Sequence, residues 1–333
     1  MFREVGSFPS LKFVTNLRHP YKKDRFQAIF FYWYYNLPSQ YLPRFSFTDG
    51  AILGAYCIII GEFYMQVSRF LERHPIDMGG TLMAVLPLQG RVCLVTGASR
   101  GIGAAIARAA ADAGASVIIN YRSSRHLAES LAGELRDSGC QAGAIQADVS
   151  SPSEVEKLFT MIESDWGPVS LLVNNAGVSL RELVTHTSDE QWEQVINTNL
   201  RGPFLCCRRA LPHMIRSRWG RIVNIASIWG IRGASCESVY AASKGGLILF
   251  TKSLAQEVGP SGVSVNALAP GPIETDMLVE ELTAQERQDL AADIPLRRLG
   301  SPEDVARMAI YLLCEGGDYI NGQVIPIDGG WTA

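Results

Sequence analysis

Residues 91–103 read RVCLVTGASRGIG and decide the fold of this chain. A short β-rich run ends at the three glycines Gly97, Gly101 and Gly103, and an alanine-rich, helix-like stretch follows over 104–113. Strand, glycine turn and helix in this order are typical of a dinucleotide-binding unit, because glycines let the backbone approach a pyrophosphate at the helix N-terminus. The alternative for the turn alone is an ordinary connection between a strand and a helix.

The alternation of strand and helix continues along the chain. Further strands are expected at 116–121, as a run that ends in Ala147-Asp148-Val149, and at 169–173, 221–225, 263–266 and 323–327. Helices are expected at 124–137, 152–165, 188–218, 276–292 and 302–314, and from Tyr240 onward. This alternation predicts an α/β fold with a Rossmann-type doubly wound parallel sheet in a single catalytic domain, residues 83–333.

The composition changes near residue 83. Residues 1–82 hold 18 of the 30 aromatic residues. The apolar run 51–61 ends at Glu62 and is shorter than the roughly 20 residues that span a bilayer. Three interpretations of this N-terminal extension stay open: a misassigned start with Met83 as the working initiator, a targeting or membrane-surface segment, or a structured extension.

Composition and charge restrict the classes of function. The net charge of −3 gives no sign of a nucleic-acid partner. The seven cysteines form no Cys-x-x-Cys pair and show no metal-ligand spacing with histidine, so we expect no metal site and a reducing compartment. We expect a cytoplasmic protein; the alternative is a mitochondrial or membrane-associated one, through residues 1–82.

The end of the second expected strand bears on cofactor choice. An acid there usually binds the 2′-hydroxyl of NADH, but the chain has Asn120, Tyr121 and Arg122. Arg100 lies in the glycine turn, and two guanidinium groups suit a 2′-phosphate. The sequence therefore favours NADPH over NADH, although either arginine alone has the alternative of an ordinary surface charge.

Tyr240 and Lys244 form a Tyr-x-x-x-Lys pair in a helix-like run. Positions i and i+4 share one helix face, so the phenol and the ammonium point into the same space. A fixed cation beside a phenol lowers the pKa of the tyrosine, which makes it a proton donor for a carbonyl near neutral pH. Alone, such a pair is also common on solvated helices.

These motifs occur together with others in a fixed order. The chain carries Thr96-Gly97-x-x-x-Gly101-x-Gly103, Asn174-Asn175-Ala176-Gly177, Asn199, Ser227, Tyr240-x-x-x-Lys244 and Pro270-Gly271. Over about 85–333 this order and spacing resembles that of the short-chain dehydrogenases/reductases, and within them most closely the 3-oxoacyl-[acyl-carrier-protein] reductases.

The resemblance implies a role for each matching residue. Tyr240 protonates the carbonyl oxygen, Lys244 holds the nicotinamide ribose and depresses the pKa of Tyr240, and Ser227 binds the substrate oxygen. Asn199 anchors a water that passes protons to Lys244. Without the resemblance, Ser227 reads as a turn cap and Asn199 as a helix cap or kink. The implied cofactor contacts are Gly97, Ser99, Arg100, Gly101, Ile102, Gly103, Arg122, Asp148, Val149, Asn175, Ala176, Gly177, Tyr240, Lys244, Pro270, Gly271, Ile273 and Thr275.

The sequence says less about the substrate. Trp229 either stacks on the substrate, beside Ser227 and Tyr240, or fills the core. The segment 273–295 is expected to be a mobile lid. The resemblance implies two basic surface residues that meet an acidic acyl-carrier protein: Arg218 is present, but the second of these positions is Ser261. The leading hypothesis is NADPH-dependent reduction of a 3-oxoacyl thioester. The alternatives are an alcohol, sugar or steroid dehydrogenase and a nucleotide-binding pseudoenzyme recruited through its extension. The resemblance also implies a homotetramer.

Overall fold

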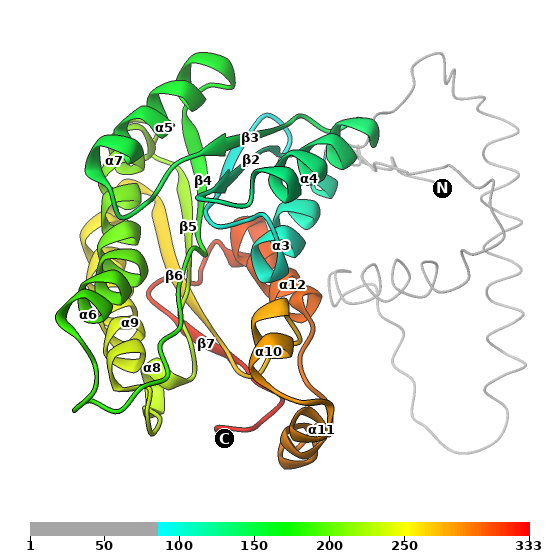
Figure 1. Ribbon diagram of the computed structural model, residues 1–333. Helices are drawn as coiled ribbons and strands as arrows, with labels where there is room; N and C mark the ends of the chain where they lie inside the picture. Colours follow the sequence, from blue (N-terminus) through cyan, green and yellow to red (C-terminus); the bar gives the residue numbers. More distant parts are fainter. Residues whose placement is uncertain (1–85) are drawn as a thin grey trace, which may run out of the picture. The chain divides into compact units, whose positions relative to one another are not determined.

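The computed structural model describes residues 86–333, apart from the side chains of residues 277, 280 and 281. In this part of the chain seven parallel strands form one sheet in the order β3-β2-β1-β4-β5-β6-β7 (Figure 1). The predicted doubly wound sheet is therefore confirmed. The three interpretations of residues 1–82, and the boundary at residue 83, lie outside the described residues. The strands are β1 (Val92–Val95), β2 (Ser116–Tyr121), β3 (Ala142–Gln146), β4 (Val169–Asn174), β5 (Gly220–Ile225), β6 (Val263–Pro270) and β7 (Val324–Ile327).

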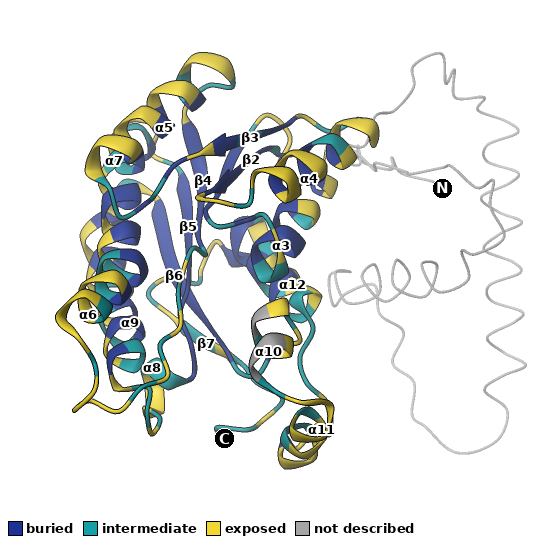
Figure 2. Ribbon diagram, in the orientation of Figure 1, coloured by how far each residue is buried: buried dark blue, intermediate teal, exposed yellow. Residues whose placement is uncertain are grey.

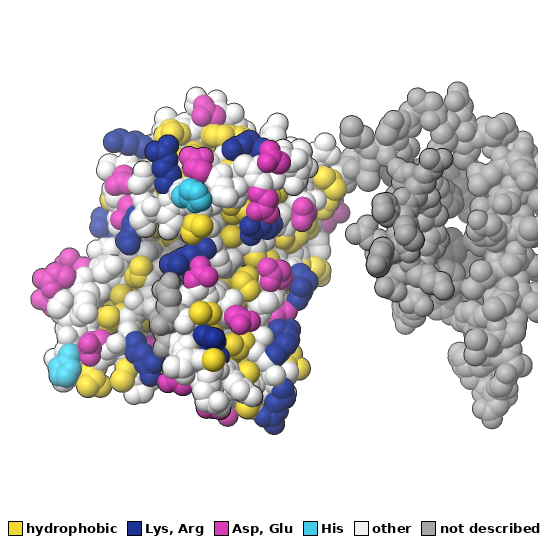
Figure 3. All heavy atoms as spheres, turned by 45° about the vertical axis from the view of Figure 1, so that its right-hand side comes forward, with side chains coloured by type: hydrophobic (Ala, Val, Ile, Leu, Met, Phe, Trp, Pro, Cys, Tyr) yellow, Lys and Arg dark blue, Asp and Glu magenta, His cyan; other side chains and the backbone are white. Residues whose placement is uncertain are grey.

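Helices cover both faces of the sheet (Figure 1). One face packs against α3, α4 and α12, and the other against α5, α7 and α9. Both signs of charge are interspersed on the side turned forward in Figure 3. The helices are α3 (Gly101–Asp112), α4 (Arg125–Asp137), α5 (Pro152–Asp165), α6 (Asp189–Ile196), α7 (Gly202–Ser217), α8 (Trp229–Arg232), α9 (Ser238–Val258), α10 (Asp276–Glu281), α11 (Ala284–Asp293) and α12 (Pro302–Leu313).

The central strands are mostly apolar because both of their faces are covered by helices. Every residue of β1, β4 and β5 is buried, and the strands form the buried middle layer in Figure 2. Parallel strands covered on both faces have near-continuous apolar sequences, and β1 reads VCLV. The segments that follow the carboxyl ends of these strands are therefore attached to a rigid core.

The strand order reverses between β1 and β4. From β1 the chain runs outward through β2 to β3, and it returns to place β4 on the other side of β1. The backbone N–H of Thr96 still donates to the carbonyl of Val173, 3.0 Å away, so the two strands separate only after these residues. In open α/β sheets, ligands bind in the crevice at such a reversal point.

Two of the expected helices are interrupted. The helical stretch 188–218 contains a π-helical turn, Asn197–Arg201, between α6 and α7. The stretch 276–292 is two helices, because Thr283 caps α11 in a box with Glu286 and so starts a new helix. The short helix α8 had no signal in the sequence.

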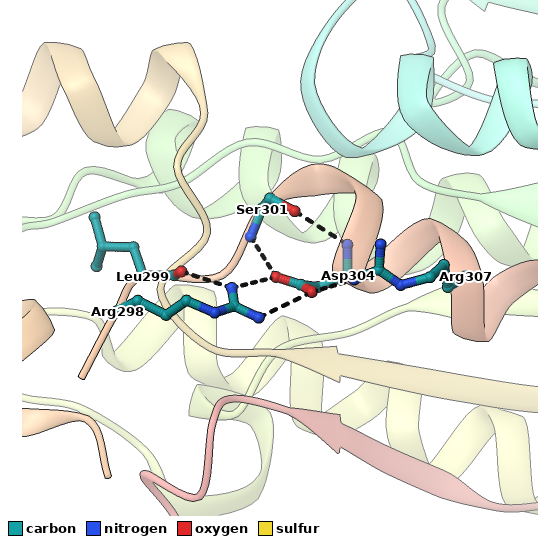
Figure 4. Close-up of polar contacts among 5 residues, drawn as sticks. All are labelled: Arg298, Leu299, Ser301, Asp304 and Arg307. Atoms are coloured by element: carbon teal, nitrogen blue, oxygen red, sulfur yellow. Dashed lines mark hydrogen bonds and ion pairs between the residues drawn. The ribbon is translucent and has the colours of Figure 1, made fainter. Parts of the chain in front are cut away.

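A charged cluster fixes the start of α12 (Figure 4). Asp304 accepts hydrogen bonds from the guanidinium of Arg298, at 2.5 and 3.1 Å, from the backbone N–H of Ser301, at 2.8 Å, and from Arg307. Arg298 first, and the Ser301 N–H second, hold the pKa of the Asp304 carboxyl well below its usual range. The charged carboxylate therefore stabilises the folded state.

The substitution Asp304→Asn should lower the free energy of unfolding at pH 7 by about 1–2 kcal/mol. A carboxyl whose pKa is depressed by folding stabilises the protein above its unfolded pKa and loses this effect as pH falls. The difference from the wild type should therefore shrink as the pH is lowered below about 4. Denaturant unfolding of both proteins, at pH 7 and at a pH below about 4, measures this difference in stability. Glu257→Gln, at an exposed site of α9, is the control. An equal loss at both pH values would contradict the electrostatic account.

Candidate active site

A cleft of about 1050 Å³ lies at the carboxyl ends of the strands. Its walls come from the glycine turn after β1, the segments that follow β2 to β6, the helices α10 and α11, and the C-terminal tail. This volume is at the upper end of the range for small-molecule sites, which suits a ligand as long as a dinucleotide.

Two glycines of the turn are required by close packing. Gly97 has a φ of +60°, and a Cβ there would lie 2.8 Å from the Cα of Ala176. A Cβ on Gly103 would lie 2.5 Å from the side-chain nitrogen of Asn175. Thr96 joins the two segments, because its hydroxyl accepts from the N–H groups of Asn175 and Ala176, both at 3.0 Å. The turn and the end of β4 thus form one rigid wall.

The N-terminus of α3, like those of α4, α7 and α9, lacks the side-chain cap that other helices carry. Helices α5, α6, α11 and α12 each begin with a serine or threonine whose side chain accepts a backbone N–H. Helix α3 has no such cap and no acid in its first turn, and its first residues line the cleft. Backbone donors without a capping acceptor at a helix N-terminus form an anion site. The wall therefore fits the pyrophosphate of a dinucleotide.

The end of β2 presents a cation to the cleft and no acid. Asn120 is buried: its side-chain oxygen accepts from the Gly97 N–H at 3.3 Å, and its nitrogen donates to the Ala147 carbonyl at 3.0 Å. Arg122 is exposed and lines the cleft. Arg100 lines it too, 3.5 Å from Asp276 of α10.

Asp148 lies on the same side of the cleft. One of its carboxylate oxygens accepts from both the N–H and the hydroxyl of Ser150, at 2.9 and 2.7 Å. The second oxygen stays available for a donor on a ligand, because the hydrogen bonds to Ser150 use only the first.

Helix α9 carries the Tyr240–Lys244 pair into the cleft. The Lys244 nitrogen lies 5.8 Å from the centre of the Tyr240 ring and donates to the Ile225 carbonyl at 2.8 Å. Lys244 is only 4% exposed, and this burial lowers the pKa of its ammonium to about 8. The cation thus stands beside the phenol, as the spacing predicts.

Ser227 and Asn199 complete the surroundings of the pair. Ser227 follows β5, lines the cleft, and its hydroxyl accepts from the Trp229 N–H at 3.2 Å. Asn199 lies in the π-helical turn, fully buried. Its amide bonds both the N–H and the carbonyl of Val178 at 2.9 Å and also donates to Ser243 at 3.0 Å. The Asn199 side chain therefore holds the segment after β4 in place.

The structure gathers nearly all of the expected site residues around this one cleft. Of the catalytic, cofactor and substrate positions, only Gly103 and Asn199 do not line it directly, and both pack behind its wall. Sequence reasoning gave no role to Thr96, Ser243, Arg181 or Trp331. Ser243 is adjacent to Lys244 and donates to the Tyr240 carbonyl at 2.7 Å, so its place in the motif was an available signal.

Neither a group of metal ligands nor a membrane-spanning helix occurs within residues 86–333. No three acidic, histidine or cysteine side chains converge as metal ligands in this part of the chain. Within the same residues, no helix combines the length and apolar character that crossing a bilayer requires.

Comparison with known proteins supplies relatives for most of the chain. The family model described as enoyl-(acyl carrier protein) reductase matches residues 97–332. The 3-oxoacyl-[acyl-carrier-protein] reductase FabG of Pseudomonas aeruginosa is 41% identical over 245 residues, which is 74% of this chain and 98% of that protein. The FabG of Aquifex aeolicus is 44% identical over 246 residues, 74% and 98% of the two chains.

Solved structures have the same architecture. A putative gluconate dehydrogenase from Agrobacterium tumefaciens superposes with a TM-score of 0.71 at 35% identity, covering 75% of this chain and 98% of the other. A blue fluorescent protein from a metagenomic library, in complex with NADPH, superposes with a TM-score of 0.70 at 37% identity. The match covers 74% of this chain and 100% of the other.

The fold, the cleft and these relatives define an oxidoreductase that uses a nicotinamide cofactor and acts on a carbonyl or hydroxyl carbon. The matches reach from the glycine turn to the C-terminal tail. The chain belongs to the short-chain dehydrogenase/reductase family.

Proposed function

We propose that this enzyme reduces a 3-oxoacyl thioester to the 3-hydroxyacyl product with NADPH, a step of fatty acid synthesis. The observation that carries the proposal is the joint presence of Ser227, Tyr240 and Lys244 in one cleft, in a chain 41–44% identical to two reductases of this specificity over nearly their whole length. The nicotinamide, when bound, supplies the hydride.

Tyr240 and Ser227 act on the carbonyl oxygen. The Tyr240 phenol gives its proton to the oxygen, on which negative charge develops as the carbon is reduced. The Ser227 hydroxyl orients the carbonyl and stabilises the same charge by a hydrogen bond. The Ser227 oxygen already accepts from Trp229, so its own hydrogen is directed toward another acceptor.

Lys244 and Asn199 support the proton donor. The buried ammonium of Lys244 favours the phenolate form of Tyr240 and holds the ribose hydroxyls beside the nicotinamide. Asn199 keeps the π-helical turn against Val178, and a water held at this turn re-protonates the tyrosine through Lys244. A π-turn is often found at functional sites, since it frees backbone groups from helical bonding.

The preference for NADPH rests on Arg122 and Arg100. Replacing Arg122 with alanine should raise the KM for NADPH about tenfold, because a guanidinium–phosphate pair is lost, and should change the KM for NADH by less than about twofold. Steady-state kinetics with both cofactors measures this. Arg125→Ala, three residues away on α4 and outside the cleft, is the matched control. Equal changes for both cofactors would contradict 2′-phosphate recognition.

An acyl-carrier protein is the proposed partner for the thioester. Arg218 is exposed two residues before β5, at the amino end of the strand and opposite its carboxyl end at the cleft, and it donates to the Pro260 carbonyl at 3.2 Å. The six residues of β5 separate these two ends by roughly 20 Å, a distance that the thioester-bearing arm of the carrier has to span. The proposal includes a homotetramer, as the resemblance implies.

A substrate panel tests the proposed function. The purified full-length protein should oxidise NADPH with acetoacetyl thioesters faster than with simple ketones, sugars or keto-steroids at equal concentration. Turnover of a sugar or steroid in preference to the thioesters would replace this proposal with a different dehydrogenase specificity. Absence of turnover with every carbonyl, together with NADPH binding, would indicate a pseudoenzyme.

A further inference from the structure

The C-terminal tail brings an aromatic side chain to the cleft. After β7, Asp328 accepts hydrogen bonds from the N–H of Gly330 at 2.9 Å, the N–H of Thr332 at 2.9 Å and the hydroxyl of Thr332 at 2.5 Å. The tail turns tightly around this carboxylate, and Trp331, half-buried within the turn, lines the cleft. Trp331 belongs to no motif of the sequence.

Trp331 packs against the residue next to the reacting centre. Its ring contacts that of Trp229 edge to face, with centroids 5.4 Å apart and planes at 60°, and Arg232 donates to the Trp331 carbonyl at 3.4 Å. The N–H of Trp229 in turn donates to the hydroxyl of Ser227. The two rings are thus linked, through the backbone N–H of Trp229, to the Ser227 hydroxyl that is proposed to bind the carbonyl oxygen.

The lid contributes further apolar side chains to the same cleft. Leu278 on α10, Leu282 at its end and Leu290 on α11 line the cleft and are half-buried. The tail is joined to the lid, because the N–H of Leu296, just after α11, donates to the Gly329 carbonyl at 3.2 Å. We call the five side chains Trp229, Trp331, Leu278, Leu282 and Leu290 the apolar wall.

The acids Glu286, Asp289 and Asp293 of α11 also line the cleft but are exposed to solvent. The other part of the substrate region is polar. Ser179 and Arg181 in the segment after β4, and Gln194 on α6, line the cleft on elements separate from the lid and tail. Helix α6 lies with α9, whereas α10 and α11 lie across the molecule from it (Figure 1). A 3-oxo thioester has the same division, with a hydrocarbon chain on one side of the ketone and a polar, amide-containing arm on the other.

We propose that the apolar wall binds the hydrocarbon chain of the substrate and that Trp331 is a specificity-determining residue favouring medium-length acyl chains. This inference rests on the proposed function and names the substrate class of the same site. Each methylene that the wall removes from water strengthens binding about fourfold. An acetoacetyl group offers this wall a single methyl group beyond its ketone, whereas a longer acyl chain offers it several methylenes.

The test compares acetoacetyl and 3-oxooctanoyl thioesters of one carrier, coenzyme A, with the full-length protein. For the wild type, kcat/KM should be at least about tenfold higher for the eight-carbon substrate. Trp331→Ala should lower the ratio of the two kcat/KM values about tenfold, mainly through the KM of the longer substrate. Trp331→Phe, which keeps a ring in the wall, should lower the ratio less. Tyr319→Ala, at a fully exposed aromatic outside the cleft, should leave it unchanged.

The outcomes separate this inference from the function on which it rests. An unchanged ratio in Trp331→Ala, or equal losses for both substrates, would overturn the role of Trp331 while leaving thioester reduction in place. A wild type that prefers the four-carbon substrate would overturn the medium-chain assignment. Failure of the wild type to reduce either thioester would overturn the proposed function, and the inference with it.

Discussion

Replacing Tyr240 with phenylalanine should reduce kcat at least about a hundredfold while NADPH still binds. The substitution removes one hydroxyl and keeps the ring that packs beside Lys244, 5.8 Å from the Lys244 nitrogen. Without the phenol, no positioned proton donor meets the carbonyl oxygen, and water is a weaker substitute. The measurements are steady-state kinetics with an acetoacetyl thioester and fluorescence titration of NADPH.

Two results would contradict the role of Tyr240. Retained turnover in the phenylalanine variant would show that another group supplies the proton. Loss of turnover together with loss of NADPH binding would point to a disrupted cleft. A matched control is Tyr311→Phe, which removes the same hydroxyl from a half-exposed tyrosine of α12 outside the cleft.

Lys244→Met should abolish activity and yet stabilise the protein. Activity should fall at least about a hundredfold, because the variant loses the cation beside Tyr240 and the donor to the ribose. Stability at pH 7, without cofactor, should rise by on the order of 1–2 kcal/mol, because folding no longer buries a charge whose pKa is lowered to about 8. This figure allows for the hydrogen bond to Ile225 that the variant loses.

The pH dependence distinguishes this explanation from better packing. Below pH 8 the wild-type lysine is charged in both the folded and the unfolded state, so folding carries the full cost of burial. Between about pH 8 and 10.5 the folded protein releases the proton while the unfolded chain keeps it, so wild-type stability rises relative to the variant. Denaturant unfolding at pH 7 and 9.5 should show the gap narrowing. A constant gap would contradict a buried charge at Lys244.

The fold could be predicted from the sequence because its signals are local. The strand, glycine turn and helix over 91–103 and the apolar strands after it depend on composition and periodicity alone. The sequence offered a cap or kink at Asn199, and the structure has the π-helical turn Asn197–Arg201 there. The form of this turn depends on the long-range bonding of Asn199 to Val178, which no local pattern reveals. The break at Thr283 has a local signal, its capping box with Glu286, which the expected helix 276–292 overlooked.

The candidate site divides in the same way. The Tyr240–Lys244 pair and the glycine turn are short motifs. Residue spacing alone therefore predicts that Tyr240 and Lys244 share one helix face and that the backbone turns at the glycines. Trp331 lies 91 residues after Tyr240, and only the folded tail around Asp328 brings it to the cleft. Asn120, at the strand end where an acid would bind NADH, is buried and bonds both Gly97 and Ala147. Arg122, two residues further on, is exposed and lines the cleft.

The most direct test of the proposed function follows the hydrogen itself. The wild-type protein is given an acetoacetyl thioester and NADPH in which both hydrogens on carbon 4 of the nicotinamide are deuterium. The product is analysed by mass spectrometry and NMR. We predict a 3-hydroxybutanoyl thioester that carries one deuterium, bound to carbon 3. A product without deuterium, or NADPH that stays unoxidised in the presence of the thioester, would contradict the proposed function.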